Sequence, residues 1–277
     1  MSSPDRFEPP RSYQRFSLSD RVQHALMVVS FLVLVATGLP QKYIYAGLPF
    51  LDELIDLMGG LELVRLIHRG AATVLMVVTV YHLMAVAQRV LVRRVPLHLL
   101  PRYQDLVDAL QAVRYNLGLA RERPRCDRYT WEEKVEYWSL LWGTAVMIAT
   151  GFMLWNPVAT ARILPGEWIP AAQVIHGGEA LLALLAVLVW HFYSVHLRHF
   201  NRSMFSGRMG EHEMQEEHPL ELERVRAGEP AAGSPEEIAR RERVFLPIAV
   251  VVGLVLLTGI YWFVTFEQTA ITTLPQK

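Results

Sequence analysis

Five histidines lie within or at the ends of long apolar segments, where an ionisable side chain is costly and usually functional. One segment carries His68 and His82, fourteen residues apart, and another carries His176 and His191, fifteen apart. In a helix, fourteen residues return a side chain to nearly the same face, about 21 Å further along the axis. Fifteen residues leave it about 60° from that face. His24 lies near the start of a third segment, so three helices would carry histidines at two depths.

This arrangement of histidines suits the binding of haem between helices. Two histidines at equal depth on facing helices supply both axial ligands of one haem, and the extra histidines permit a third haem. Zinc is a weaker candidate because it needs three or four ligands around one point. The single cysteine, Cys126, excludes internal disulfides, a cysteine-rich metal site and thioether attachment of haem. We therefore predict two haems b, or three, held by histidine pairs.

The elements that must position these histidines are transmembrane helices. Charged residues make up 19% of the chain and the mean hydropathy is +0.22, whereas soluble domains are about 25% charged. Five nearly uncharged stretches are each long enough to cross a hydrocarbon core of roughly 30 Å: Val22–Gln41, Gly70–Gln88, Tyr137–Ala161, Ala180–Leu197 and Val244–Phe266. No small-residue cleavage site follows the first stretch, which we interpret as a retained helix. The sequence predicts an all-α membrane protein, with a four-helix transmembrane haem-binding bundle plus a fifth C-terminal transmembrane helix.

Lysine and arginine are distributed unevenly between the connecting segments. Of the 27 in the chain, 22 lie in 1–21, 89–134 and 198–243. The positive-inside rule then predicts a multi-pass inner-membrane protein with a cytoplasmic N-terminus and a periplasmic C-terminus. The predicted organisation is a cytoplasmic N-terminal segment (1–20), a four-helix cytochrome b domain (21–198), a charged, partly flexible cytoplasmic linker (199–243), the fifth transmembrane helix (244–266) and an outer-side tail (267–277).

The first four predicted helices contain a weak internal repeat. The first ends with Thr37-Gly38 and the third with Thr150-Gly151, and the second and fourth both open with the pattern H-x-G-x-A. The core is therefore expected to consist of two related hairpins. The repeat also favours His82 and His191 as the inner pair.

The order and spacing of several motifs are informative together. They are Arg21-x-x-His24 opening the first helix, His68-Arg69 starting the second, His176 with Trp190-His191-Phe192-Tyr193 in the fourth, and Tyr115-Asn116-x-Gly118 followed by Glu133-Lys134 before the third. Over about residues 15–200, these motifs resemble the membrane cytochrome b subunits of respiratory formate dehydrogenases and NiFe hydrogenases. The resemblance does not explain the charged segment and the helix that follow.

The resemblance implies a di-haem, quinone-reactive subunit with one ligand on the first helix, one on the second and two on the fourth. Carried over, the outer haem is held by His68 and His176, and the inner haem by His24 and His191. The spacing of fifteen in the fourth helix departs from the fourteen of the family. His24 and His82 both remain candidates for the second inner ligand.

The resemblance also implies a quinone, menaquinone or ubiquinone, near the inner haem. The candidates by position are Asn116, Glu133, Lys134 and Tyr137, which would otherwise cap a loop or anchor the membrane interface. At the outer surface Arg65 and Arg69 flank His68. They are candidates to bind haem propionates as bidentate donors, or to anchor the helix.

We therefore expect a b-type cytochrome subunit of a respiratory membrane complex, passing electrons between the quinone pool and an outer-side redox partner. The chain has no flavin, molybdenum or C-x-x-C-H motif, so the partner would be another polypeptide, an iron–sulfur or multihaem cytochrome c protein. Membrane lipid is expected to surround the bundle, and no nucleic acid is expected to bind. The alternative is a haem-free transporter or membrane anchor with proton-relay histidines, which would lack a b-type visible spectrum.

Overall fold

The computed structural model describes residues 11–198, 200–228 and 234–266. Within these residues, five helices are long and apolar enough to cross a membrane, which confirms the predicted all-α membrane fold. They are α1 (Leu18–Tyr43), α3 (Leu61–Leu91), α5 (Trp131–Trp155), a fourth helix from Trp168 to Arg198, and α11 (Pro235–Thr265). The expected tail at 267–277 and residues 1–10 of the N-terminal segment lie outside the described residues.

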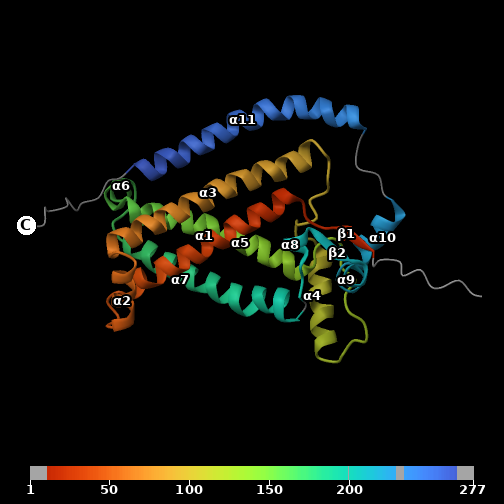
Figure 1. Ribbon diagram of the computed structural model, residues 1–277, viewed down its shortest axis with the longest axis horizontal. Helices are drawn as coiled ribbons and strands as arrows, with labels where there is room; N and C mark the ends of the chain where they lie inside the picture. Colours follow the sequence, from red (N-terminus) through yellow and green to blue (C-terminus); the bar gives the residue numbers. More distant parts are fainter. Residues whose placement is uncertain (1–10, 199, 229–233, 267–277) are drawn as a thin grey trace, which may run out of the picture.

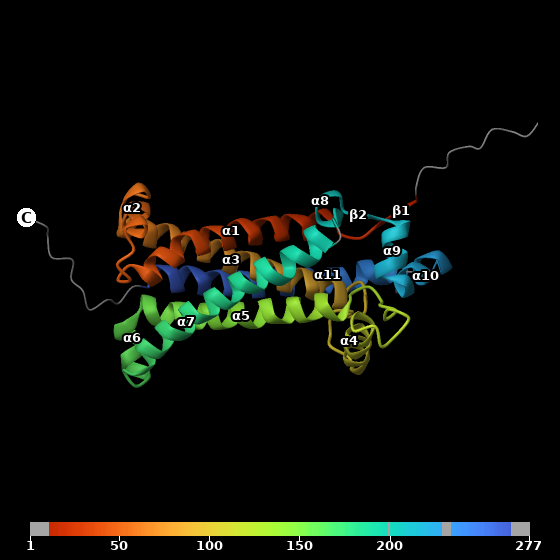
Figure 2. The ribbon, with the colours of Figure 1, turned by 90° about the horizontal axis from the view of Figure 1, so that it is seen from below.

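The membrane helices pack as two hairpins with one helix added. α1 lies along α3, and α5 lies along α7 (Trp168–Leu185), the first part of the fourth helix. Contacts between α1 and α7 join the two hairpins. α11 lies along α3, at the edge of the bundle in Figure 1 and behind it in Figure 2. The four helices that carry or face the histidines therefore form the core.

Local sequence determines where three of the membrane helices begin. Ser17, Thr130 and Ser234 each accept a hydrogen bond from the backbone N–H three residues later, and the carboxylate at that later position accepts one in return. Such capping boxes satisfy backbone amides that have no partner inside the helix. They fix the starting points of α1, α5 and α11, and hence the depth of every side chain these helices carry.

The fourth helix changes its winding part-way. α7 is α-helical, whereas the next two segments, Ala186–His191 and Tyr193–Arg198, are π-helical. A π turn is closed by a hydrogen bond across five residues instead of four, so it accommodates one extra residue. The fifteen residues from His176 to His191 therefore advance the helix about as far as fourteen would in a regular α-helix.

The two ends of the bundle are covered differently. One end carries two short helices, α2 (Pro49–Leu57) and α6 (Pro157–Ile163). The other end carries α4 (Tyr103–Asn116) and a small folded unit made of 11–14 and 200–228, which we call the extramembrane unit (Figures 1 and 2). The elements of this unit are β1 (Ser12–Gln14), α8 (Ser203–Ser206), β2 (Arg208–Gly210), α9 (Glu211–Glu217) and α10 (Pro219–Ala227).

The extramembrane unit is folded where the sequence predicted a partly flexible linker. β1 pairs antiparallel with β2, with Tyr13 opposite Met209. The side chains that form its small core are Tyr13, Met209, Met214 and Leu222. His218 is also buried, and its Nδ1 donates a hydrogen bond to the carbonyl of Asp127 at 2.9 Å. These contacts join the N-terminal strand, the loop before α5 and the segment after the fourth helix.

The fifth membrane helix is longer than predicted. α11 begins at Pro235 rather than at 244, because Ser234 caps it and proline is favoured at the first helical position. Arg241 donates to the carbonyl of Val92 at 3.1 Å. The charged first turns of α11 therefore extend beyond its apolar part and pack against the end of α3.

Candidate functional site

The structure brings His68 of α3 and His176 of α7 together, towards the α2 end of the bundle. Their ring centroids lie 6.4 Å apart and their planes are inclined at 61°. Thr37 Oγ1 of α1 lies 2.8 Å from His68 Nδ1, and Thr150 Oγ1 of α5 lies 2.9 Å from His176 Nδ1. We call these two residues the outer pair, after the orientation predicted from the sequence. Each ring is held from behind by a threonine of the neighbouring helix.

The threonine hydroxyls determine which ring nitrogen carries the proton. Thr37 Oγ1 donates to the carbonyl of Val33 at 2.6 Å, and Thr150 Oγ1 donates to the carbonyl of Val146 at 2.7 Å. Because each hydroxyl proton is used in this way, the hydroxyl oxygen accepts from the histidine Nδ1–H. The other ring nitrogen, Nε2, is therefore unprotonated and available to a metal.

The glycine after each threonine gives the ring its space. A Cβ added to Gly38 would lie 3.1 Å from His68 Cε1, and one added to Gly151 would lie 3.5 Å from His176 Cε1. The first of these contacts is tighter than an ordinary van der Waals contact. The repeated Thr-Gly pair thus supplies a hydrogen-bond acceptor and room for a ring beside the backbone.

The second pair, the inner pair, consists of His24 of α1 and His191 of the fourth helix, towards the α4 end. Their ring centroids are also 6.4 Å apart, with planes inclined at 42°. His191 Nδ1 lies 2.8 Å from Glu136 Oε2 of α5. An ionised carboxylate only accepts, so His191 Nδ1 carries the proton and Nε2 is available to a metal. The π-helical segment that ends at His191 sets the face on which this ring lies.

His82 belongs to the inner layer but has other partners. Its Nδ1 lies 3.0 Å from Gln23 Oε1, and its Nε2 lies 3.0 Å from the hydroxyl of Tyr137. Both ring nitrogens are thus in hydrogen bonds to protein side chains. The structure brings His24, and not His82, against the ring of His191, while the identity of the second inner ligand stays a prediction.

Both pairs fit a bis-histidine haem site. Imidazoles bound through about 2 Å bonds to opposite sides of one metal have ring centres roughly 6 Å apart, and both measured separations are 6.4 Å. Among the described residues, no three or more His, Cys, Asp or Glu side chains gather to hold a metal ion by themselves. Each pair therefore suits the two axial positions of an iron whose other ligands come from a porphyrin.

The cationic side chains near the outer pair have different surroundings. Arg69, next to His68 in sequence, places its guanidinium carbon 4.2 Å from the centroid of the Trp155 ring. Arg65 is exposed and forms a 2.9 Å ion pair with Glu62. Lys42, which sequence reasoning did not single out, lies over the residue after His176, since a Cβ added to that glycine would be 2.5 Å from Lys42 Nζ.

The four residues predicted to contact a quinone are not equivalent. Asn116 is exposed at the end of α4. Glu133 closes the capping box of α5, and Lys134 is buried with its Nζ 2.5 Å from Asp105 Oδ1. Tyr137 is the one of these four residues whose side chain is hydrogen-bonded to a membrane histidine, His82, in the described part of the chain. The first three therefore have evident structural roles at the α4 end.

Three residues that hold the histidine rings escaped the sequence reasoning: Thr37, Thr150 and Glu136. The two threonines were noticed in the sequence as part of the repeated Thr-Gly pair. The sequence did not show that their hydroxyls lie against the histidine rings. Glu136 lies one residue before the third apolar stretch, so a search for charges inside the stretches passes over it. Its position at the border of an apolar segment is the signal that could have identified it.

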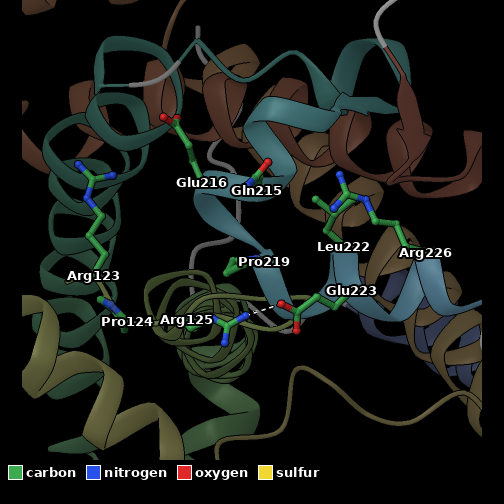
Figure 3. Close-up of a pocket in the computed structure, with 9 residues that line it drawn as sticks. All are labelled: Arg123, Pro124, Arg125, Gln215, Glu216, Pro219, Leu222, Glu223 and Arg226. Atoms are coloured by element: carbon green, nitrogen blue, oxygen red, sulfur yellow. Dashed lines mark hydrogen bonds and ion pairs between the residues drawn. The ribbon is translucent and has the colours of Figure 1, made fainter.

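A surface pocket of about 340 Å³ lies at the extramembrane unit (Figure 3). It is lined by Arg123, Pro124, Arg125, Gln215, Glu216, Pro219, Leu222, Glu223 and Arg226. Arg125 and Glu223 form a 2.5 Å ion pair at its edge. Its charges are mixed in sign and none of the five membrane histidines lines it, so the pocket plays no part in the site.

A family model described as prokaryotic cytochrome b561 matches residues 15–207, more than half of the chain. The chain belongs to this family. The cytochrome b556(Fdn) subunit of the nitrate-inducible formate dehydrogenase of Escherichia coli (strain K12) is 20% identical to the chain over 224 residues, which cover 81% of the chain and 96% of that subunit. The corresponding subunits of Escherichia coli O157:H7 and Shigella flexneri match to the same extent.

Membership confirms the resemblance seen in the motifs. The chain is a b-type cytochrome electron-transfer subunit, binds haem b and is a multi-pass inner-membrane protein. A haem-free transporter or anchor is thereby disfavoured. The family match ends at residue 207, so α9, α10 and α11 lie outside it.

Proposed function

We propose that the chain passes electrons between the quinone pool and a periplasmic redox partner through two b haems. His68 and His176 bind the outer haem, and His24 and His191 bind the inner haem. The observation that carries this proposal is the presence, towards opposite ends of one bundle, of two histidine pairs with the same 6.4 Å ring separation. Bound haem supplies reversible one-electron chemistry. The protein supplies the axial nitrogens, the hydrogen bonds behind them and a surround of low dielectric constant.

The choice of His24 over His82 rests on hydrogen bonding. A haem ligand needs an unprotonated nitrogen directed at the iron, and both nitrogens of His82 are within 3.0 Å of side-chain oxygens. His24 has its ring towards His191 instead. Ligation by His82 would require its bond to Gln23 or to Tyr137 to break.

A quinone head group is proposed to bind beside His82 and Tyr137. Quinone carbonyls accept hydrogen bonds and quinol hydroxyls donate them, so a binding site needs groups that can do either. The chain Gln23–His82–Tyr137 offers such groups inside membrane helices, where polar side chains are costly. Gln23 precedes His24 in sequence, so this hydrogen-bonded series of side chains adjoins the inner haem. Asn116, Glu133 and Lys134 would then support the surrounding loop.

The outer haem is proposed to exchange electrons with a second polypeptide in the periplasm, an iron–sulfur or multihaem cytochrome c protein. Support comes from the name of the relative, which is one subunit of a formate dehydrogenase. Arg69 and Lys42 are proposed to pair with propionates of the outer haem. Proteins that copurify with the chain in mild detergent would identify the partner.

The haem content of the purified protein tests the central proposal. The wild type should show a reduced b-type alpha band and two haems per chain. H24A should lose one haem, whereas H82A should keep both and react more slowly with a quinol analogue. Two haems in H24A and one in H82A would reverse the ligand assignment, and the absence of an alpha band would remove the haem function.

Cysteine labelling tests the proposed orientation. Burial raises the pKa of the Cys126 thiol to about 12, so the native thiol should not react at neutral pH. Tyr45 and Tyr103 are 97% and 81% exposed near opposite ends of the bundle. A membrane-impermeant maleimide should label Y45C in intact spheroplasts and Y103C only after lysis. The opposite pattern would invert the topology.

A further inference from the structure

The histidine rings of the two pairs are held by chemically different groups. In the outer pair, both Nδ1–H groups donate to neutral hydroxyls, those of Thr37 and Thr150, at 2.8 and 2.9 Å. In the inner pair, His191 donates to a carboxylate, Glu136 Oε2, at 2.8 Å. The two sites thus share their ring separation and differ by one negative charge behind a ligand.

The contact between Glu136 and His191 is built into the packing of two helices. Glu136 comes from α5, whose start is fixed by the Thr130 capping box six residues earlier. Next to His191, the ring of Trp190 packs edge-on against Trp131 of α5, with centroids 6.1 Å apart. The side chains of Glu136 and His191 are 26% and 37% exposed, so surrounding groups shield most of the bond.

A carboxylate behind a ligand ring changes the iron that the ring binds. It draws the Nδ1 proton towards itself, which increases the electron density on Nε2 and the basicity of the ligand. A more basic ligand stabilises ferric iron more than ferrous iron, because the ferric state carries the greater positive charge. A hydroxyl acceptor has no net charge and a weaker effect. Hydrogen bonding behind the ligand is one of the means by which proteins set haem potentials.

We infer that Glu136 is a positioning residue that makes the inner haem the lower-potential haem of the two. This inference rests on the proposed bis-histidine sites. At equilibrium, an electron shared between the two haems then resides mainly on the outer one.

Potentiometric titration of the purified protein, followed at the alpha band, tests the inference. The haem signal that remains in H68A identifies the inner haem. In the wild type, the midpoint potential of this haem should be lower than that of the outer haem. In E136Q, the equilibrium constant for transfer from the inner to the outer haem should fall at least tenfold, which is 59 mV for a one-electron couple. The outer component should not move.

A matched control separates the hydrogen bond from the general loss of charge. E132Q removes the same charge from the same helix one turn earlier, without the bond to His191, and should change the equilibrium constant less than threefold. An unchanged inner potential in E136Q would overturn the inference, and so would an equal shift in E132Q. If E136Q releases the inner haem, E136D, which keeps the charge and shortens the reach, should show an intermediate shift.

Loss of the inner haem from both E136Q and E136D would also overturn the inference, since Glu136 would then act in haem retention. Failure of the proposed function is distinct from these results. It would appear already in the wild type, as fewer than two haems per chain.

Discussion

The outer and inner histidine pairs have equal ring separations, but they follow from different features of the sequence. The outer pair repeats closely between the two hairpins. Each ligand lies about two turns inside the second helix of its hairpin, and a Thr-Gly pair in the last two turns of the first helix holds it. The inner pair breaks the repeat. His191 faces His24 at the start of α1, and its ring is held by the carboxylate of Glu136 instead of a threonine hydroxyl. The repeat therefore accounts for both ligands of the outer site, but for only one of the two proposed ligands of the inner site.

Removal of an outer ligand is the most severe test of this comparison. H176A should lower the haem content from two per chain to one and leave the inner alpha band unchanged, because the two sites share no ligand. H212A serves as the control, since the His212 side chain is 88% exposed in α9. Loss of both haems in H176A would mean that the sites are not independent.

Removal of the outer threonines should have a smaller effect, again confined to one site. T150V keeps the shape of the side chain and deletes the acceptor behind His176, so the affinity for the outer haem should fall about 10–100-fold, as for other partners of metal ligands. Haem retention during dilution or transfer to apo-myoglobin measures this. T79V is matched, because Thr79 also bonds the carbonyl four residues earlier, at 2.8 Å, in α3. An equal loss of haem affinity in T79V and T150V would show that Thr150 has no specific role in holding His176.

Because the segment before His191 is π-helical, we expect the inner site to tolerate the deletion of one residue there. Deletion of Val187 should let the segment before His191 become α-helical, with fourteen residues between the ligands, and both haems should be retained. Deletion of Val29 should cost a haem, because α1 is α-helical throughout and has no extra residue to release. Haem content and thermal stability of the two variants decide the matter. The idea fails if the two deletions behave alike.

The smallest expected effect concerns the extramembrane unit, which covers only the α4 end of the bundle (Figure 1). Burial, together with the nearby carboxylates of Glu133 and Glu213, raises the pKa of Glu217 to about 7. A carboxyl whose folded pKa exceeds its unfolded pKa stabilises the fold at low pH and loses that contribution as pH rises through the folded value. Proteolysis within 200–228 should therefore quicken a few-fold from pH 6 to pH 8, and E217Q should remove this difference. A pH dependence that persists in E217Q would point to another group.

Much of the fold was predictable because membrane insertion depends on the length and polarity of each segment. The five spans and the two hairpins followed from hydropathy and from the repeat, and the pairing of His68 with His176 was implied by the resemblance to membrane cytochromes b. The π turn before His191 was not predictable, since its energy depends on packing against α1 and α5 and not on the local sequence. The role of Glu136 was not predictable either, because it depends on the contact of its carboxylate with the ring of His191 on another helix. The fold of 200–228 was missed because its core includes Tyr13, almost two hundred residues away.

The π turn has a consequence for comparing this chain with its relatives. An insertion inside a membrane helix normally rotates everything beyond it, so alignments seldom place gaps there. Here one added residue is absorbed before His191, so the ligand keeps its face of the helix. A relative with fourteen residues between the two ligands aligns correctly only if a gap is opened within 186–191. Without that gap, every position from His191 onwards is compared with the wrong neighbour, and the ligand itself is mismatched.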